Sequence, residues 1–270
     1  MDNRPIGVFD SGLGGLTAVK ELLHIMPHEN IIYFGDTGRV PYGSRSRETI
    51  MKYAGQDMAF LESKNVKMII AACGTVSSVA PGIGEKLALP YTGVLKPAAA
   101  AAGKTTRNGK VGVIATTATI RSGSYRRELA AINSEIEVFD RDCPLFVPLV
   151  ENGWIGEDEQ VTRLVAQRYL TPLREAGIDT LIMGCTHYPI IRHIISEVMG
   201  SGVTLIDSGR ETAAYCSALL KKQGLLCDRS ADGDCSFYVS DRMEGFSQIA
   251  GIFLGKDIKR EVSHVDIDLY

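Results

Sequence analysis

The chain has 270 residues, of which 45% are hydrophobic and 23% charged, and a formal net charge of −3. A chain of this length buries enough surface to fold as one large or two ordinary α/β domains without a disulfide or a metal. The slightly acidic balance argues against a nucleic-acid groove, so we expect no direct nucleic-acid partner.

The first four residues, MDNR, lead directly into an apolar run and leave no room for a signal peptide. No apolar run reaches the roughly 18 residues that a membrane span needs. Both features predict a cytoplasmic protein without a membrane partner. In that reducing compartment the 6 cysteines should be free thiols, and because no Cys-x-x-Cys pair is present we predict no metal site.

Short apolar, β-branched runs alternate with longer amphipathic segments along the chain. The runs predict strands at 5–9, 31–34, 67–72, 91–94, 111–115, 136–139, 180–184, 203–206 and 236–239. The segments predict helices at 15–26, 46–64, 75–88, 97–107, 120–132, 157–175, 188–199, 210–223 and 241–254. This alternation predicts an α/β fold in which mostly parallel sheets are flanked by helices.

Two stretches of the chain resemble each other. Residues 65–75 (NVKMIIAACGT) and 177–187 (GIDTLIMGCTH) each end a buried-looking strand in a short polar loop, and these loops contain Cys73 and Cys185. A duplication of this kind predicts two pseudo-symmetric domains with the active site in the cleft between them. We therefore expect one thiol on each side of a small substrate.

Ligands of open α/β sheets bind beyond the carboxyl ends of the strands, so the loops there are the places to search. The first loop, residues 10–15 (DSGLGG), lacks a dinucleotide fingerprint because Thr17 stands where the third glycine belongs. A tight turn whose backbone N–H groups meet an anion fits it better. Asp10 alone would be a helix cap, but beside a thiol it becomes a candidate base or orienting group.

Three other loops contain candidate residues. Residues 36–44 form a dense turn signal that by itself indicates only a loop. Cys185 precedes a predicted helix whose N-terminal dipole favours a thiolate, and His187 could exchange protons with this thiol or merely cap the helix. Glu151 follows a proline-containing turn, where a surface role is the default.

The number and spacing of the cysteines favour some classes of reaction over others. A disulfide oxidoreductase needs cysteines close in sequence, and a cysteine hydrolase needs one nucleophile with a histidine. Two thiols at matching positions suit the inversion of a stereocentre, in which one group removes a proton from one face of a carbon and another returns a proton to the opposite face. The ordinary thiol pKa of about 8.5 lies close enough to neutral pH for this work.

Several motifs together resemble the signature set of the glutamate racemases, cofactor-independent enzymes that make D-glutamate for bacterial peptidoglycan. They are 10–16 (DSGLGGL), 36–43 (DTGRVPYG), 72–75 (ACGT), 111–116 (VGVIAT), 148–151 (PLVE), 184–189 (GCTHYP) and 237–241 (FYVSD). The resemblance therefore spans nearly the whole chain.

The resemblance implies a role for each candidate residue. It makes Cys73 the acid/base for D-glutamate, assisted by Asp10, and Cys185 the acid/base for L-glutamate, assisted by His187 and Glu151. It assigns substrate binding to backbone and side-chain groups of Asp10, Ser11, Tyr42, Gly43, Gly74, Thr75, Thr117, Thr186 and His187.

The resemblance also implies an organisation. It predicts a first α/β domain of residues 1–97 plus 211–270, a second α/β domain of residues 98–210, and a homodimer. It predicts glutamate as the substrate and neither pyridoxal phosphate nor a metal as cofactor.

Gly74 departs from the family pattern, which has an asparagine after the first cysteine. Because glycine offers only its N–H, we expect weaker binding or turnover and an unchanged reaction class. An aspartate racemase therefore remains an alternative, as does a catalytically weakened relative that binds a ligand or a partner. The presence of both cysteines, Asp10, Glu151 and His187 favours an enzyme.

Overall fold

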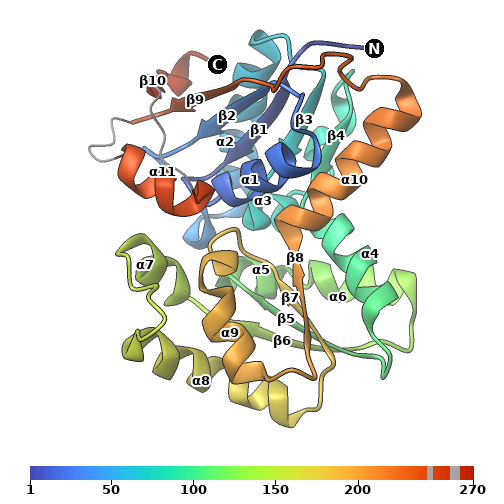
Figure 1. Cartoon of the computed structure of the whole chain (residues 1–270), viewed down its shortest axis with the longest axis vertical. Coiled ribbons are helices and arrows are strands. Elements are labelled where there is room, and N and C mark those ends of the chain that lie inside the picture. The colour runs from blue at the N-terminus through green and yellow to red at the C-terminus, as the bar shows by residue number, and fades with distance from the viewer. Residues whose placement is uncertain (242–245, 256–261) are drawn as a thin grey trace.

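The computed structural model describes residues 1–241, 246–255 and 262–270, and in this part the strands form two parallel sheets (Figure 1). The first sheet has the order β10-β9-β2-β1-β3-β4 and the second has the order β6-β5-β7-β8. The first contains β1 (Ile6–Asp10), β2 (Ile31–Gly35), β3 (Met68–Ala71), β4 (Tyr91–Gly93), β9 (Cys235–Val239) and β10 (Val262–His264). The second contains β5 (Lys110–Ala115), β6 (Glu137–Asp142), β7 (Thr180–Met183) and β8 (Thr204–Asp207). The predicted α/β fold with parallel sheets is confirmed.

Helices cover both faces of each sheet (Figure 1). They are α1 (Leu16–Ile25), α2 (Arg47–Ser63), α3 (Gly74–Val79), α4 (Leu95–Thr105), α5 (Thr117–Ser122), α6 (Ser124–Ile132), α7 (Phe146–Glu151), α8 (Gln160–Glu175), α9 (Arg192–Met199), α10 (Ser208–Gln223) and α11 (Phe246–Leu254). Successive side chains of a strand point to opposite faces, so Val8 packs in the core that contains α1, whereas Phe9 packs in the core that contains α2. Burial on both faces explains why the central strands are continuous apolar runs.

The chain passes from one sheet to the other and back. Helix α4 leads from β4 to β5, and α10 leads from β8 back toward β9, packing against α1 and α4 on the way. The first sheet consequently takes strands from both ends of the chain (Figure 1). The domain boundaries at 1–97 plus 211–270 and 98–210 stay a prediction.

The helix predicted at 75–88 is wrong in its extent. Helix α3 ends at Val79, and a short 3-10 turn follows at Ile83–Lys86. The break is caused by Pro81, which lacks an N–H and disfavours helical backbone at Ala80.

The helix predicted at 120–132 is two helices, α5 and α6, which meet at Gly123 with φ +65°. The segment predicted as one helix at 188–199 opens with a 3-10 turn, Tyr188–Ile191, before α9. In both places a local change of backbone geometry interrupts an otherwise amphipathic pattern.

Among the α-helices and strands of the described residues, two were not predicted. Helix α7 replaces the turn that Pro148 had suggested before Glu151. Pro148 lies in the first turn of this helix, where its missing N–H removes no helical hydrogen bond. Strand β10 is three residues long and mostly exposed, so it lacks an apolar pattern. The predicted helix at 157–175 begins at Gln160, and residues 242–245 of the helix predicted at 241–254 lie outside the described residues.

Candidate functional site

The two cysteine loops touch each other. Cys73 follows β3 and caps the N-terminus of α3, and Cys185 follows β7 in the other sheet. A methyl group added to Gly74 would lie 2.4 Å from the carbonyl oxygen of Gly184 and 3.9 Å from the Cα of Cys185. The backbones of the two loops are therefore in direct contact, and both thiols are buried, with 4% and 6% of the residue surface exposed.

Further contacts join the carboxyl ends of the two sheets at the same place. A methyl group on Gly14 would lie 2.2 Å from Thr186 Oγ1 and 2.5 Å from the His187 ring. The Thr17 hydroxyl lies 2.9 Å from the carbonyl oxygen of Thr186 and donates toward it. The glycine-rich turn after β1 thus packs against the second cysteine loop, and only glycine fits at position 14.

The first thiol lies beside a buried acid. Cys73 Sγ donates to Ser11 Oγ at 3.4 Å, and the Asp10 carboxylate accepts the backbone N–H groups of Gly12 and Gly15 at 3.2 and 3.0 Å. The anion met by this glycine-rich turn is therefore its own Asp10 side chain.

The surroundings of the first thiol keep it protonated. Burial first, and then the nearby Asp10 carboxylate, raise the pKa of Cys73 to about 12. Burial also raises the pKa of Asp10 itself, against the opposing effects of the His187 charge and the backbone N–H groups.

The second thiol lies beside a histidine. Cys185 Sγ is 3.9 Å from His187 Nδ1, and His187 Nε2 is 3.0 Å from Glu151 Oε1. Burial alone would lower the pKa of His187, but the hydrogen bonds and charges of Cys185 and Glu151 outweigh burial and raise it to about 10. The edge of this ring meets the ring of Phe253 on α11, with centroids 5.3 Å apart. An imidazolium therefore lies between a thiol and a carboxylate.

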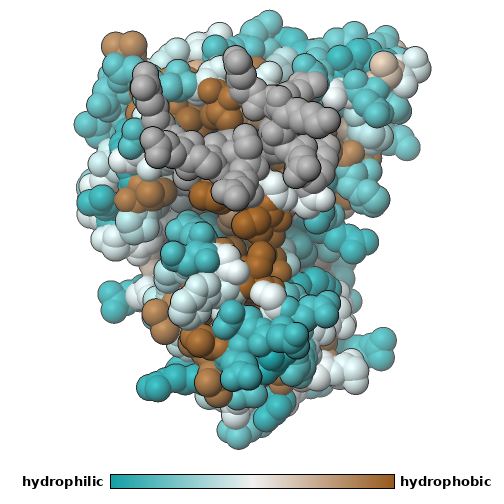
Figure 2. All heavy atoms as spheres, turned by 60° about the vertical axis from the view of Figure 1, so that its left-hand side comes forward, coloured by the Kyte–Doolittle hydropathy of each residue, from teal (hydrophilic) through white to brown (hydrophobic). Residues whose placement is uncertain are grey.

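Glu151 lies at the rim of the site. Its side chain is 49% exposed, and it ends α7. A cavity of about 190 Å³ lies beside it, lined by Gly12, Leu13, Thr37, Val40, Glu151, Asp241 and Ile249. In Figure 2, which turns the side with α7 and α11 toward the viewer, apolar side chains gather on the surface just below the residues drawn in grey. Glu151 therefore contacts His187 on one side and lies beside this surface cavity on the other.

Two of the predicted binding residues have hydroxyl groups that are hydrogen-bonded within the protein. The Tyr42 hydroxyl is buried and contacts the carboxylates of Asp36 and Asp57, so only the backbone of Tyr42 is left for a ligand. The Thr117 hydroxyl donates to Asp142 at 2.8 Å and can still accept a hydrogen bond. The expectation that the Tyr42 hydroxyl holds the substrate is therefore not supported by the geometry, whereas the binding role of Thr117 stays a prediction.

Thr116 is a further candidate site residue, to which the sequence analysis gave no role. Its hydroxyl lies 3.2 Å from that of Thr75 and donates to that of Thr119 at 3.1 Å, so it joins the two halves beside α3. A methyl group on Gly43 would lie 3.6 Å from Thr116 Cβ. Residues 111–116 (VGVIAT) also resemble residues 6–11 (IGVFDS), and Thr116 occupies the position in this second copy that Ser11 occupies in the first, which is a signal that the sequence contains.

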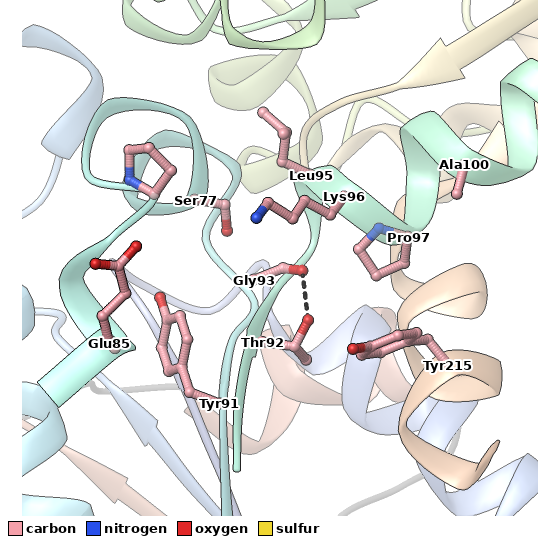
Figure 3. Close-up of a pocket in the computed structure, with 12 residues that line it drawn as sticks. Ser77, Glu85, Tyr91, Thr92, Gly93, Leu95, Lys96, Pro97, Ala100 and Tyr215 are labelled. Carbon is pink, nitrogen blue, oxygen red and sulfur yellow. Dashed lines mark hydrogen bonds between the residues drawn. The ribbon is translucent and has the colours of Figure 1, made fainter. Parts of the chain in front are cut away.

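The described residues lack a metal-binding cluster and a helix that could span a membrane, and they line a second cavity. No three His, Cys, Asp or Glu side chains gather there as a group that could hold a metal ion. None of the described helices is both long enough and apolar enough to cross a bilayer. A cavity of about 450 Å³, lined by residues that include Tyr91, Lys96 and Tyr215, contains neither cysteine (Figure 3).

Comparisons with known proteins agree with this geometry. Residues 16–216 match the model of a family described as Asp/Glu/Hydantoin racemase. The glutamate racemase of Geobacter metallireducens is 46% identical over 253 residues, which cover 93% of each chain. The glutamate racemase of Streptococcus gordonii is 46% identical over 272 residues, covering 99% of this chain and 100% of the relative.

A solved structure has the same fold throughout. The crystal structure of glutamate racemase from Francisella tularensis, in complex with D-glutamate, superposes with a TM-score of 0.92 at 40% identity and covers 100% of both chains.

Proposed function

This chain belongs to the Asp/Glu/hydantoin racemase family, and on that premise we propose that it interconverts L- and D-glutamate without a cofactor. One thiol removes the α-proton, and the other returns a different proton to the opposite face of the carbon. The observation that supports the proposal is the contact between the backbones of the two cysteine loops, one of which follows β3 in the first sheet and the other β7 in the second. The relatives at 46% identity are glutamate racemases, which supports glutamate over aspartate as the substrate.

The reaction from L- to D-glutamate uses each thiol once. The Cys185 thiolate takes the α-proton of L-glutamate and becomes a thiol, and the electron pair left on the α-carbon forms a carbanion. The Cys73 thiol then gives its proton to the opposite face of this carbon and becomes a thiolate. The return reaction runs the same steps in reverse, so Cys73 is the base for D-glutamate.

The partners of each thiol support this assignment. The His187 imidazolium lies 3.9 Å from Cys185 Sγ, which stabilises a thiolate there, and Glu151 holds the charged ring in place. The raised pKa of Cys73 keeps the other thiol protonated and ready to donate. Asp10 serves as the group that helps to remove this proton when D-glutamate is the substrate.

The polar groups around the two loops would hold the amino acid. We assign this role to Ser11, Gly43, Gly74, Thr75, Thr186 and the newly found Thr116. Preorganised donors of this kind stabilise the charge that develops on the substrate carboxylate in the carbanionic transition state.

The wider setting follows from the family resemblance. We propose that the product is D-glutamate for peptidoglycan, that the enzyme acts in the cytoplasm, and that it forms a homodimer. The alternative of a ligand-binding or partner-binding relative is less favoured, because a binder has no need of two thiols in opposed loops.

The test is exchange of the α-proton with solvent. Purified protein without added cofactor is incubated in deuterated water with L- or D-glutamate, and separately with the aspartate enantiomers. We expect the product enantiomer of glutamate to contain deuterium at the α-carbon, because the proton that returns comes from an exchanged thiol. Absence of exchange in folded protein would overturn the proposal, and faster turnover of aspartate would overturn the substrate assignment.

Two variants test the two-thiol mechanism in the same assay. Cys73→Ser and Cys185→Ser should each lose at least about 10³-fold in kcat, because a serine hydroxyl is a far weaker acid than a thiol. Cys227→Ser is the matched control, since Cys227 is a half-buried cysteine outside both loops, and it should keep full activity. Full activity in either loop variant would disprove the mechanism.

A further inference from the structure

A buried polar cluster lies beneath the turn at residues 41–44. Asp36 follows β2, Asp57 lies in α2, and the side chains of both acids are 0% exposed. Tyr42 begins the turn and is 1% exposed, and the Arg39 side chain is 13% exposed. Buried charges are costly unless they are paired, so a cluster of this composition needs an explanation.

The hydrogen bonds of the cluster form a connected set. The Tyr42 hydroxyl contacts Asp36 Oδ2 and lies 3.1 Å from Asp57 Oδ2. Arg39 Nε donates to Asp36 Oδ2 at 2.6 Å, and Arg39 Nη2 donates to Asp57 Oδ1 at 3.0 Å. Tyrosine and arginine together therefore bridge the two carboxyl groups.

Tyr42 and Arg39 are the donors of the cluster, and the two carboxyl groups accept from them. A phenol has a single hydrogen, so the Tyr42 hydroxyl donates to one of the two carboxyl groups at a time. Burial, and next the charge of Asp36, raise the pKa of Asp57, and the Arg39 guanidinium opposes this shift.

The cluster fastens the turn to three elements. Ser240, just after β9, donates to Asp36 Oδ1 at 2.7 Å and accepts the N–H of Gly38 at 2.9 Å. Arg39 donates to Gln56 of α2 at 2.6 Å. Residues 36–39, which lead from β2 into the turn, are thus hydrogen-bonded to α2 and to the residue just after β9.

The opposite side of the turn faces the candidate active site. Gly43 lies against Thr116, and the hydroxyl of Thr116 is bonded to that of Thr75, two residues after Cys73. A shift of the turn would therefore change the wall of the site next to the first thiol.

We propose that Asp36, Asp57 and the Tyr42 hydroxyl are positioning residues that hold the backbone of Tyr42 and Gly43 where it binds a carboxylate of the amino acid. This inference rests on the proposed racemase function. None of the three side-chain groups need touch the substrate, since each acts through the backbone of the turn.

Two variants that remove links of the cluster test the inference. Tyr42→Phe removes the bridging hydroxyl, and Asp36→Asn removes the negative charge that accepts from Tyr42 and Arg39. We expect KM for both glutamate enantiomers to rise about tenfold while kcat stays within about threefold, because a displaced binding turn weakens ground-state and transition-state binding alike.

Asp57→Asn is a third variant. It removes the second carboxyl group that the Tyr42 hydroxyl and Arg39 contact, so KM should rise as it does in the other two variants. A KM unchanged in all three variants, with only a lower melting temperature, would overturn the inference, because the cluster would then serve stability alone.

A second readout does not depend on turnover. Amide hydrogen exchange of residues 42–45 should become faster in Tyr42→Phe and in Asp57→Asn, since the cluster fixes this backbone. A wild type that fails to racemise glutamate would refute the proposed function. Unchanged amide hydrogen exchange in Tyr42→Phe would refute the positioning role of the cluster. The two failures are therefore distinguishable.

Discussion

The two cysteine loops come from similar stretches of sequence but lie in opposite electrical surroundings. Cys73 lies beside Asp10, a buried acid, and its pKa is raised to about 12. Cys185 lies beside His187, whose own pKa is raised to about 10 by Cys185 and Glu151 against the effect of burial. The first thiol therefore faces an acid and the second faces an imidazole, so the two loops differ in the group that can exchange a proton with each thiol.

The difference between the loops traces to two positions of the repeat. Asp10 in the first copy corresponds to Ala115 in the second, and His187 in the second corresponds to Thr75 in the first. The duplication therefore supplies two equivalent loops, and the residues that have diverged give each thiol its own proton partner. The comparison predicts that mutations of these partners act unequally on the two directions of the reaction.

The largest effect is expected from His187→Asn. Without an imidazolium next to Cys185, the thiolate loses its charge partner and kcat for L-glutamate should fall about 10³-fold, within the range of general acid–base catalysis. The measurement is the initial rate from each enantiomer, followed by circular dichroism. Glu151→Gln is the control, since Glu151 is the half-exposed partner of His187, and its kcat should fall far less. A loss below about tenfold in His187→Asn would remove histidine from the mechanism.

The stability of His187→Asn provides a second test, which asks whether the His187 ring is charged in the folded protein. The pKa of His187 is raised from 6.5 to about 10 in the folded protein, so its charge stabilises the fold fully below pH 6.5, and this contribution is lost as pH rises through about 10. The melting temperature of the wild type minus that of His187→Asn should accordingly fall between pH 6.5 and 10. A difference independent of pH would mean that the ring is neutral.

A smaller and opposite effect is expected from Asp10→Asn. The amide oxygen can still accept the N–H groups of Gly12 and Gly15, so the turn should fold as before. The lost acid slows deprotonation of Cys73, and we expect kcat for D-glutamate to fall about 10²-fold, with a larger substrate deuterium isotope effect from D- than from L-glutamate. Equal isotope effects in both directions would show that Asp10 does not act on one thiol in particular.

The sequence predicted the parts of this comparison that depend on local pattern. Alternating strands and helices gave the parallel sheets, and the polar loops at strand ends gave Cys73, Cys185 and Asp10. Both kinds of signal are contained within about ten neighbouring residues, since period and turn chemistry are local properties.

The parts that were missed depend on contacts between distant segments. The hydroxyl of Tyr42 was expected at the substrate, but Asp57, fifteen residues away in α2, holds it in the protein interior. Thr116 faces Thr75 across the two sheets, and only a residue-by-residue reading of the repeat would have singled it out. No local pattern specifies which of several hydroxyls in a loop faces the other half of the molecule.

The smallest effect is expected at Gly74, where the two loops meet. A methyl group there would lie 2.4 Å from the carbonyl oxygen of Gly184, so Gly74→Ala must push the cysteine loops apart. Because catalysis depends strongly on the placement of the reacting groups, we expect kcat/KM to fall about tenfold.

Gly74→Asn separates this steric effect from the polar one. It brings the same displaced backbone as Gly74→Ala and adds an amide that can bind the polar head of the amino acid, so its kcat/KM should exceed that of Gly74→Ala by several-fold. The steady-state kinetics of both variants with glutamate measure the steric effect and the polar effect separately. Equal values in the two variants would mean that the amide contacts nothing at the site. Values at or above the wild type in Gly74→Ala would mean that the loops separate freely, so that their close contact contributes nothing to proton transfer between each thiol and the α-carbon.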